Sequence, residues 1–288
     1  MSAERVPVKW VIFDLDGTLY RGKTAIPGAA ASVNHLRQHV SCRFLSNNGE
    51  RQAQDLEERL RGLGFRIEAG DVASSADLVL EYVGEHHPSS RVLALTSEHL
   101  AHALEARGCT LVEDESAELI VVGVDRRLSR PRLTPALRAA LNGATIIGTN
   151  EDPTFPGECG MKPAAGAFVG IFRGMGFEPH RLCGKPSEWA VREALKRWEI
   201  DDPTACLFVG DNLRTDIAAA VVVGARSALV RSGVSNEAEL TESEAKPTLV
   251  IDSVADLSPD CLEELAEVPL PAAPHVRARP IRQEAQCG

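Results

Sequence analysis

Short apolar runs alternate with longer amphipathic stretches along most of this chain. The first run, residues 10–13, ends at an aspartate, and the next, residues 42–45, ends in small polar residues. Between such runs, residues 51–63 place leucines on one helical stripe and charged residues elsewhere. Strand-length apolar runs separated by amphipathic helices are typical of parallel sheets covered by helices. The pattern therefore predicts an α/β fold with a doubly wound, Rossmann-like parallel sheet.

Capping residues, glycine stops and apolar periodicity set the expected element boundaries. Helices are expected at residues 28–39, 51–63, 72–83, 97–108, 165–175 and 213–223, with two more opened by Thr134-Pro135 and by Ser187. Strands are expected at residues 10–13, 42–45, 91–95, 119–122, 145–147, 206–209, 227–230 and 248–251. Pro27 is expected in the first turn of its helix, where a missing N–H costs little. Glu57 and Arg61 are expected to pair on the surface of theirs.

The order of these elements predicts two domains. A chain of 288 residues exceeds the usual size of one compact domain. Residues 84–181 form a self-sufficient series of strands and helices, so we expect them to be an α/β cap inserted into a core made of residues 1–83 and 182–268. Residues 269–288, rich in Pro, Ala and Arg with no apolar period, are expected to be loosely ordered.

Charge and composition narrow the functional classes. The net charge is −10, and such a chain lacks the clustered Lys and Arg that neutralise nucleic-acid phosphates, so no nucleic-acid partner is expected. No apolar run approaches the roughly 20 residues of a membrane helix, so no membrane partner is expected. The start has no apolar signal segment, and the seven scattered cysteines include no Cys-x-x-Cys pair. Both features predict a reduced, cytoplasmic protein.

Two aspartates stand directly after the first strand. If the backbone stays extended, the carboxylates of Asp14 and Asp16 project to the same side, at the carboxyl end of a parallel strand. Such a pair repels unless a cation lies nearby, and Mg²⁺ is the natural candidate because it binds carboxylates, water and phosphate oxygens. Taken alone, Asp-Leu-Asp-Gly-Thr is also an ordinary turn sequence.

A second strand, residues 207–209, also ends in acidic residues. Asp211 would reach the same sheet edge as a further metal ligand, supported by Asn212 and by Asp216, which would orient metal-bound water. Both aspartates equally suit the start of a helix, where the macrodipole favours negative charge.

A phosphate among these acids needs donors. Ser46 and Asn47 end their strand before a helix, where a hydroxyl and free N–H groups can hold phosphate oxygens. Lys185, in a Gly-Lys-Pro-Ser turn, supplies a positive charge for both a carboxylate nucleophile and a phosphoryl group. A lone lysine is usually solvated, so it is the order of these residues after the acidic pair that suggests a phosphate site.

Together the four segments resemble the four motifs of the haloacid dehalogenase (HAD) superfamily. The segments are Phe-Asp-Leu-Asp-Gly-Thr-Leu-Tyr, Leu-Ser-Asn-Asn, Gly-Lys-Pro-Ser and Val-Gly-Asp-Asn-Leu-Arg-Thr-Asp. The last two, with residues 149–153 and 232–235, resemble in particular the NagD-like branch, whose α/β cap (type IIA) lies between the second and third motifs. The resemblance covers roughly residues 10–257, with Ser46 where Thr is commoner.

The resemblance implies a magnesium-dependent phosphatase with a covalent intermediate. By it, Asp14 attacks phosphorus to form an aspartyl phosphate, while Asp16 protonates the leaving alcohol and later deprotonates the hydrolytic water. Mg²⁺ would be held by Asp14, the main-chain carbonyl of Asp16, and Asp211. Lys185 would steady the nucleophile and, with Ser46 and Asn47, the phosphate.

The implied substrate is a small phosphorylated metabolite. The branch admits sugar phosphates, nucleoside monophosphates, glycerol phosphate, phosphoglycolate and pyridoxal phosphate. Asn48, together with Asn150 and Asp152 in the cap loop 150–156, is expected to face the leaving group, as is the segment 158–166. A homodimer formed through the cap is an open alternative to a monomer.

Two other functions are weighed against a phosphatase. Residues 17–24 formally match the Walker A pattern of P-loop NTPases. A P-loop should continue into a helix, yet Pro27 interrupts within one turn, and Asp14 and Asp16 would have no role. The other alternative is a non-catalytic phospholigand-binding module or receiver-like phosphoacceptor, although a sensor could dispense with Asp16 and a receiver needs no cap.

Overall fold

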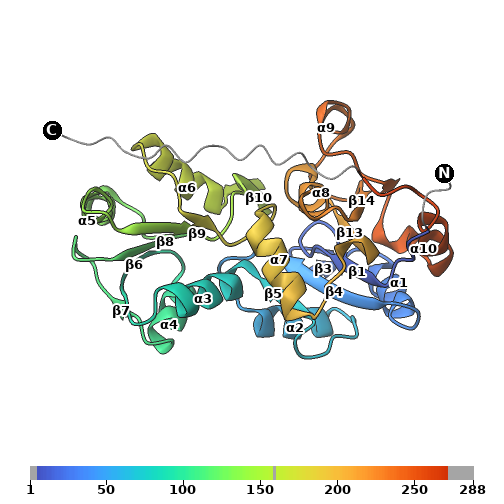
Figure 1. Ribbon diagram of the computed structural model, residues 1–288, viewed down its shortest axis with the longest axis horizontal. Coiled ribbons are helices and arrows are strands. Elements are labelled where there is room, and N and C mark those ends of the chain that lie inside the picture. The colour runs from blue at the N-terminus through green and yellow to red at the C-terminus, as the bar shows by residue number, and fades with distance from the viewer. Residues whose placement is uncertain (1–4, 158–159, 272–288) are drawn as a thin grey trace.

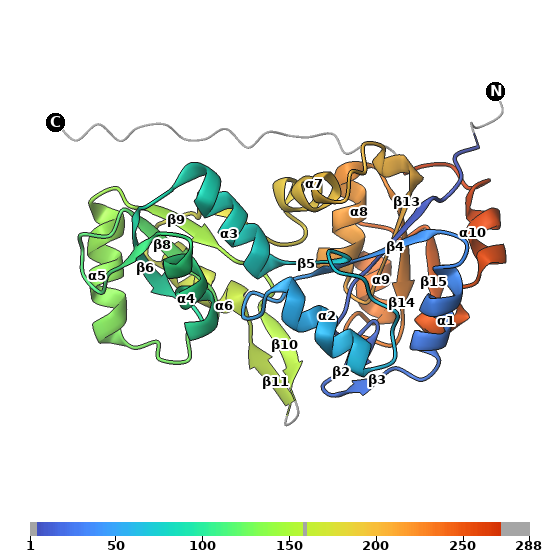
Figure 2. The same ribbon diagram turned by 90° about the horizontal axis from the view of Figure 1, so that it is seen from below.

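The computed structural model describes residues 5–157 and 160–271. Two parallel sheets form two lobes that lie side by side (Figures 1 and 2). The strands of the larger sheet are β1 (Trp10–Phe13), β4 (Ser41–Ser46), β5 (Val72–Ser74), β13 (Cys206–Gly210), β14 (Arg226–Val230) and β15 (Leu249–Ile251). Those of the smaller sheet are β6 (Arg91–Leu95), β7 (Thr110–Leu111), β8 (Leu119–Val122), β9 (Thr145–Gly148) and β12 (Arg181–Leu182). The predicted α/β fold with a Rossmann-like parallel sheet is confirmed.

The strand order of the larger sheet creates a switch point at its centre. The order is β15-β14-β13-β1-β4-β5, so the chain builds from β1 toward one edge and returns at β13 to build toward the other. In open α/β sheets, ligands bind outside the carboxyl ends of the strands at such a point. Asp14 follows β1 and Asp211 follows β13, which places one acid on each side of the switch.

Alternation along the strands buries both faces of the larger sheet. Ile12 faces one apolar cluster, whereas Val11 and Phe13 face another, as the period of two in a strand requires. The first cluster includes the helices α3 (Ser75–His86), α7 (Glu188–Arg197) and α8 (Ala218–Val223). The second includes α1 (Ala29–Leu36), α2 (Ala53–Gly62) and α10 (Pro259–Leu265). Figure 2 shows these helices on the two faces of the sheet.

The smaller sheet, with strand order β12-β9-β8-β6-β7, is covered in the same way. Its helices are α4 (Glu98–Ala106), α5 (Arg130–Leu141) and α6 (Ala165–Gly174). α5 and α6 cover one face, while α4 shares the cluster of α3 and α7 on the other. One apolar cluster therefore runs without a break from one lobe to the other. The larger sheet draws on residues 10–74 and 206–251 and the smaller on residues 91–182, while the domain boundaries themselves stay a prediction.

Several expected boundaries are wrong. The stretch 72–83 begins with a strand, because Val72 and Ala73 extend the larger sheet beside β4, and α3 starts only after Ser74. Ser74 caps α3 in a capping box with Asp77. α5 begins at Arg130 rather than at Thr134, so that Pro135 lies inside the helix.

Other differences concern turns. Gly28 is the N-cap of α1, so Pro27 lies before the helix rather than in its first turn. The helix expected at residues 213–223 starts with a π-helical turn, Leu213–Ile217, before α8. The remaining short elements are α9 (Glu237–Glu242) and two 3₁₀ turns, Pro203–Ala205 and Val254–Asp256. Glu57 pairs with Arg61 as expected, but it is buried rather than at the surface. Its carboxylate also accepts a hydrogen bond from Gly70 N.

Two antiparallel hairpins lie in stretches where the sequence predicts no strand. β2 (Tyr20–Arg21) pairs with β3 (Thr24–Ala25), and β10 (Thr154–Gly157) pairs with β11 (Gly160–Pro163). The second hairpin falls within the cap segments expected to face the substrate, of which residues 158–159 lie outside the described part. The tail expected at residues 269–288 lies outside it from residue 272 on.

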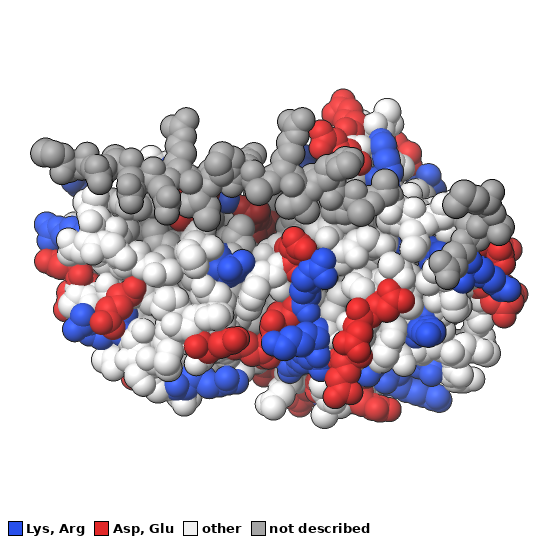
Figure 3. All heavy atoms as spheres, viewed as in Figure 1, with Lys and Arg blue, Asp and Glu red and all other residues white. Residues whose placement is uncertain are grey.

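The described helices include none long and apolar enough to cross a membrane. On the face in Figure 3, acidic and basic side chains are interspersed among the described residues rather than gathered into one basic patch.

Candidate active site

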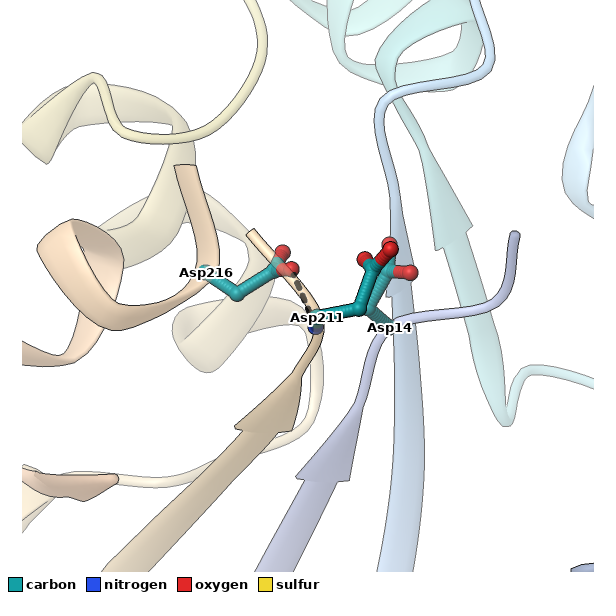
Figure 4. Close-up of side chains that lie close together, drawn as sticks. All are labelled: Asp14, Asp211 and Asp216. Atoms are coloured by element: carbon teal, nitrogen blue, oxygen red, sulfur yellow. Dashed lines mark hydrogen bonds between the residues drawn. The ribbon is translucent and has the colours of Figure 1, made fainter. Parts of the chain in front are cut away.

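Three aspartates from two strand ends come together at the switch point. Oxygen atoms of Asp14, Asp211 and Asp216 all lie within 4.8 Å of one another. Asp14 and Asp211 point the same way from the ends of β1 and β13, with Asp216 beside them (Figure 4). Asp211 and Asp216 are buried, and Asp14 is half-buried. The parallel topology thus joins residues that are about 200 positions apart in the sequence, because the carboxyl ends of neighbouring parallel strands meet at one edge of the sheet.

Lys185 is the cation of this group. Its buried ammonium donates to Asp14 Oδ1 and to Asp216 Oδ1, each at 2.7 Å. Burial lowers the pKa of Lys185, but the carboxylates of Asp14 and Asp216 together raise it above its ordinary value, so the side chain stays charged. The structure therefore brings Lys185 to Asp14, as expected.

Three carboxylates and one ammonium leave an excess of negative charge in a buried place. Burial raises the pKa of Asp14 from 3.8 to about 7, with Lys185 opposing the shift and Asp216 adding to it. Burial, followed by the charges of Asp14 and Asp216, also raises the pKa of Asp211 well above its usual range. Raised pKa values in buried carboxylates indicate a site that lacks positive charge.

A divalent cation fits this donor set. If all three carboxylates are ionised, the net charge with Lys185 is −2, which a divalent ion would cancel. Asp14 and Asp211 supply hard oxygen ligands of the kind Mg²⁺ prefers. The main-chain carbonyl of Asp16 also fits, because it accepts no hydrogen bond from any other part of the described chain.

Asp16 stands apart from the three aspartates and is held by Tyr20. The Tyr20 hydroxyl donates to Asp16 Oδ2 at 3.0 Å. Withdrawal of the carboxyl group from water raises the pKa of Asp16, and the Tyr20 bond lowers it. Because the residue as a whole is solvent-exposed, an acid/base role for Asp16 is supported by its position beside the site rather than by its pKa. Tyr20 was assigned no role from the sequence, although it lies within the first motif.

Asp216 supports the site through protein contacts. One oxygen binds Lys185, and the other accepts from Asp211 N at 3.1 Å and from Asn212 N at 3.0 Å. The Asn212 side chain accepts from Arg214 N and caps the following turn. Both residues thus hold the loop that carries Asp211, and the expected water-orienting role of Asp216 stays a prediction.

The side chains of Ser46 and Asn47, expected to bind phosphate, differ in how many of their hydrogen-bonding groups are already used. Ser46 is buried, and its hydroxyl accepts a hydrogen bond from Asn48 N at 3.1 Å. The side chain of Asn47 binds Asp152 and the main chain of Lys185 instead of facing an open site. Both of its side-chain N–H donors are used, so this side chain has none left for a phosphate oxygen. Phosphate binding through the main-chain N–H groups at this strand end stays a prediction.

The residues expected to face the leaving group are also engaged. Asn48 Oδ1 accepts from Glu50 N and Arg51 N and shapes its own turn. Asn150 is buried and donates to the Asn47 carbonyl at 2.7 Å. Asp152 accepts from Asn47 at 2.8 Å. The contacts with Asn47 place Asn150 and Asp152 between the two lobes, whereas those of Asn48 Oδ1 lie within its own turn. Contact of any of the three with a substrate stays a prediction.

A segment near residue 233 completes the site. Val234 N donates to Asp211 Oδ2 at 2.9 Å, and Ser232 Oγ donates to the Gly17 carbonyl at 2.9 Å. A Cβ atom at Gly233 or at Gly17 would overlap the Asp211 carboxylate. This segment was noticed in the sequence only as part of the resemblance, and its contact with Asp211 was not foreseen.

The segment that matches Walker A forms no P-loop. Residues 20–25 fold as the β2–β3 hairpin, and Lys23 is exposed at its turn. A phosphate-binding loop would instead continue into a helix from its lysine.

Comparison with known proteins places the chain in a family. Residues 11–110 match the family model of haloacid dehalogenase-like hydrolases, and residues 182–257 match a second, HAD-hydrolase-like model. An acid sugar phosphatase of Staphylococcus saprophyticus is 31% identical over 83% of this chain and 93% of that protein. The p-nitrophenyl phosphatase from Archaeoglobus fulgidus superposes with a TM-score of 0.81 at 32% identity, covering 90% of this chain and all of that one.

Two further solved structures bear on the metal and on the branch. The glycerol phosphate phosphatase from Mycobacterium tuberculosis in complex with magnesium has a TM-score of 0.76 at 31% identity, covering 88% of this chain and 78% of that one. A putative nagD protein has a TM-score of 0.76 at 25% identity, covering 86% and 96%. This chain therefore belongs to the haloacid dehalogenase-like hydrolases, as a phosphoric monoester hydrolase of the NagD-like branch.

Proposed function

We propose that this protein is a magnesium-dependent phosphatase that hydrolyses small phosphomonoesters through an aspartyl phosphate on Asp14. The observation that carries the proposal is the contact of Lys185 Nζ with Asp14 at 2.7 Å beside Asp211, at the carboxyl edge of one parallel sheet. A carboxylate, a fixed ammonium and a second acid around one point are what covalent phosphoryl transfer needs.

The chain's own residues divide the work as follows. Lys185 holds Asp14 Oδ1 and so orients the other oxygen of Asp14 for attack on phosphorus. This attack forms the Asp14–phosphorus bond and breaks the P–O ester bond, so the alcohol leaves. Asp16, positioned by the Tyr20 hydroxyl, gives its proton to that alcohol. In the second half, Asp16 takes a proton from water, which attacks the phosphoryl group and releases Asp14 and inorganic phosphate.

Asp14, Asp211 and the carbonyl of Asp16 are the groups proposed to hold magnesium. The bound ion would offset the repulsion between these acids and an anionic substrate. The excess negative charge of the site and the magnesium complex of the glycerol phosphate phosphatase both support this assignment.

The proposed substrate is a small phosphorylated metabolite, such as a sugar phosphate, a nucleoside monophosphate or glycerol phosphate. The acid sugar phosphatase and the glycerol phosphate phosphatase support this class without choosing within it. We propose a cytoplasmic location, no nucleic-acid or membrane partner, and a homodimer through the smaller lobe as the alternative to a monomer.

Release of inorganic phosphate from p-nitrophenyl phosphate and from a set of small esters tests the proposal. Asp14→Asn is expected to abolish turnover, because an amide cannot attack phosphorus, and Asp16→Asn to impair it by roughly 100-fold or more. Lys23→Ala is the matched control and should keep nearly full activity, since Lys23 is exposed at the turn of the β2–β3 hairpin. Loss with Lys23→Ala and retention with Asp14→Asn would favour the P-loop function, and no turnover of any ester would favour a binding module.

A further inference from the structure

Asn47 connects the catalytic lysine to the smaller lobe. Its side-chain nitrogen donates to Asp152 Oδ2 at 2.8 Å and to the Lys185 carbonyl at 3.0 Å. Its Oδ1 accepts from Lys185 N at 2.7 Å. The Asn47 amide thus pairs with both main-chain polar groups of Lys185 while its second N–H reaches across to Asp152.

The loop that carries Asp152 is fixed to the same place. Asn150 Nδ2 donates to the Asn47 carbonyl at 2.7 Å, and Asn150 Oδ1 accepts from Asp152 N at 3.0 Å. The packing is tight, because a Cβ atom at Gly184 would lie 2.7 Å from Asn47 Oδ1 and from the Thr149 carbonyl. A shift of this loop would therefore also displace Asn47 and Gly184, the residue before Lys185.

Asp152 depends on Asn47 for its hydrogen bonding. Its Oδ1 is buried and has no hydrogen-bond partner among the described residues, while Oδ2 has only Asn47. The charged and titratable groups around it are Lys185, Asp216 and Glu151. Without Asn47, the carboxyl group would be left between the lobes with no donor, which is costly for a buried acceptor.

We propose that Asn47 and Asp152 form a latch, in which Asn47 is a positioning residue that ties the loop after β9 to the main chain of Lys185 and so holds Lys185 against Asp14. The inference rests on the proposed function, because the Lys185–Asp14 pair is what the latch positions. It gives Asn47 a role different from a phosphate ligand. The side chain acts on the reaction through Lys185, without touching the substrate.

A double-mutant cycle with p-nitrophenyl phosphate tests the latch. Asn47→Ala is expected to lower kcat by about 10- to 100-fold, the range for losing hydrogen bonds to a charged or main-chain group, with a smaller change in KM. Asp152→Ala should lower kcat by the same amount or less. Because the two residues act as one unit, the double variant should fall within about threefold of Asn47→Ala.

The conservative variant Asp152→Asn separates the latch from a charge effect. Its amide oxygen can still accept from Asn47, so kcat should stay within about threefold of wild type. If the losses of the two alanine variants multiply in the double variant, the residues act independently and the latch is wrong. If Asp152→Asn is as impaired as Asp152→Ala, the carboxylate acts by its charge, and the latch is wrong as well.

Amide hydrogen exchange gives a readout that needs no activity. Both alanine variants should raise exchange in residues 148–153 and 183–187, and an unchanged pattern in both segments would overturn the latch. Asn47→Asp, which removes both donors at nearly constant size, replaces Asn47→Ala if that variant does not fold. If the wild type hydrolyses no ester, the proposed function has failed, and the exchange pattern alone decides the latch.

Discussion

Removing the divalent cation should make the stability of this protein fall as the pH rises from 5 to 8. The perturbation is chelation, compared with excess magnesium at each pH. Without the ion, Asp14 and Asp211 are buried acids whose pKa values are raised, the first to about 7. Between the ordinary value and the raised value, the folded protein binds more protons than the unfolded chain, so the free energy of unfolding decreases with rising pH.

The size of the effect follows from Asp14. A rise from 3.8 to about 7 is about 3 pH units, which corresponds to about 4 kcal/mol. This contribution is fully present below pH 3.8 and is lost as the pH passes through about 7. Asp211 adds a contribution of the same sign. Magnesium competes with these protons, so it should stabilise the protein more at pH 8 than at pH 5.5.

Thermal unfolding followed by circular dichroism at several pH values measures both trends. Asp14→Asn is the control, because an amide does not titrate and the slope of Tm against pH should flatten relative to wild type. Other groups titrate in the same window, and the difference between the two proteins isolates Asp14. A wild-type Tm that rises from pH 5 to 8 under chelation, or a magnesium effect that is equal at all pH values, would refute the buried excess of negative charge.

Two further substitutions test packing that the structure alone reveals. Gly233→Ala should weaken magnesium binding, measured by calorimetry, by about tenfold or more. Its Cβ would displace the Asp211 carboxylate, and we expect the lost binding free energy to be about that of one hydrogen bond. Gly170→Ala, with open space around its Cβ, should bind normally, and equal affinities of the two variants would contradict the close approach. Glu57→Ala should lower the free energy of unfolding by about 1–3 kcal/mol, because it removes the buried carboxylate that accepts from Gly70 N and from Arg61. The exposed Glu58→Ala is the denaturant-unfolding control, and a loss as large in Glu58→Ala would speak against a stabilising role of these two hydrogen bonds.

The main site residues could be predicted because each follows a strand. β1, β4 and β13 end at Phe13, Ser46 and Gly210, each of which is a polar residue of the site or directly precedes one. Parallel strands in one sheet bring their carboxyl ends to one edge, so sequence order along the strands implied spatial proximity. The same argument placed Asp211 beside Asp14, and the structure agrees.

The partners of the side chains could not be predicted in this way. Nothing local in the sequence shows that the Asn47 side chain binds Lys185 and Asp152, because a side chain that faces a substrate would stand at the same strand end. β5 has only three residues and shows its strand character only beside β4. The β10–β11 hairpin contains prolines and glycines in place of alternating β-branched residues, so the sequence carries no strand signal there.

The arrangement of the two sheets suggests how phosphate and leaving group are recognised. Asn47 follows β4 of the larger sheet, and Asn150 and Asp152 follow β9 of the smaller one, yet both of these residues hydrogen-bond to Asn47. The carboxyl edges of the two sheets therefore face each other, with the acids and Lys185 on one side and the β9 loop on the other. We therefore expect a phosphate bound at Asp14 to direct its ester group toward the smaller lobe. We expect substitutions that change only leaving-group preference to lie in the loops of the smaller sheet, whereas substitutions at the larger sheet should affect all esters alike.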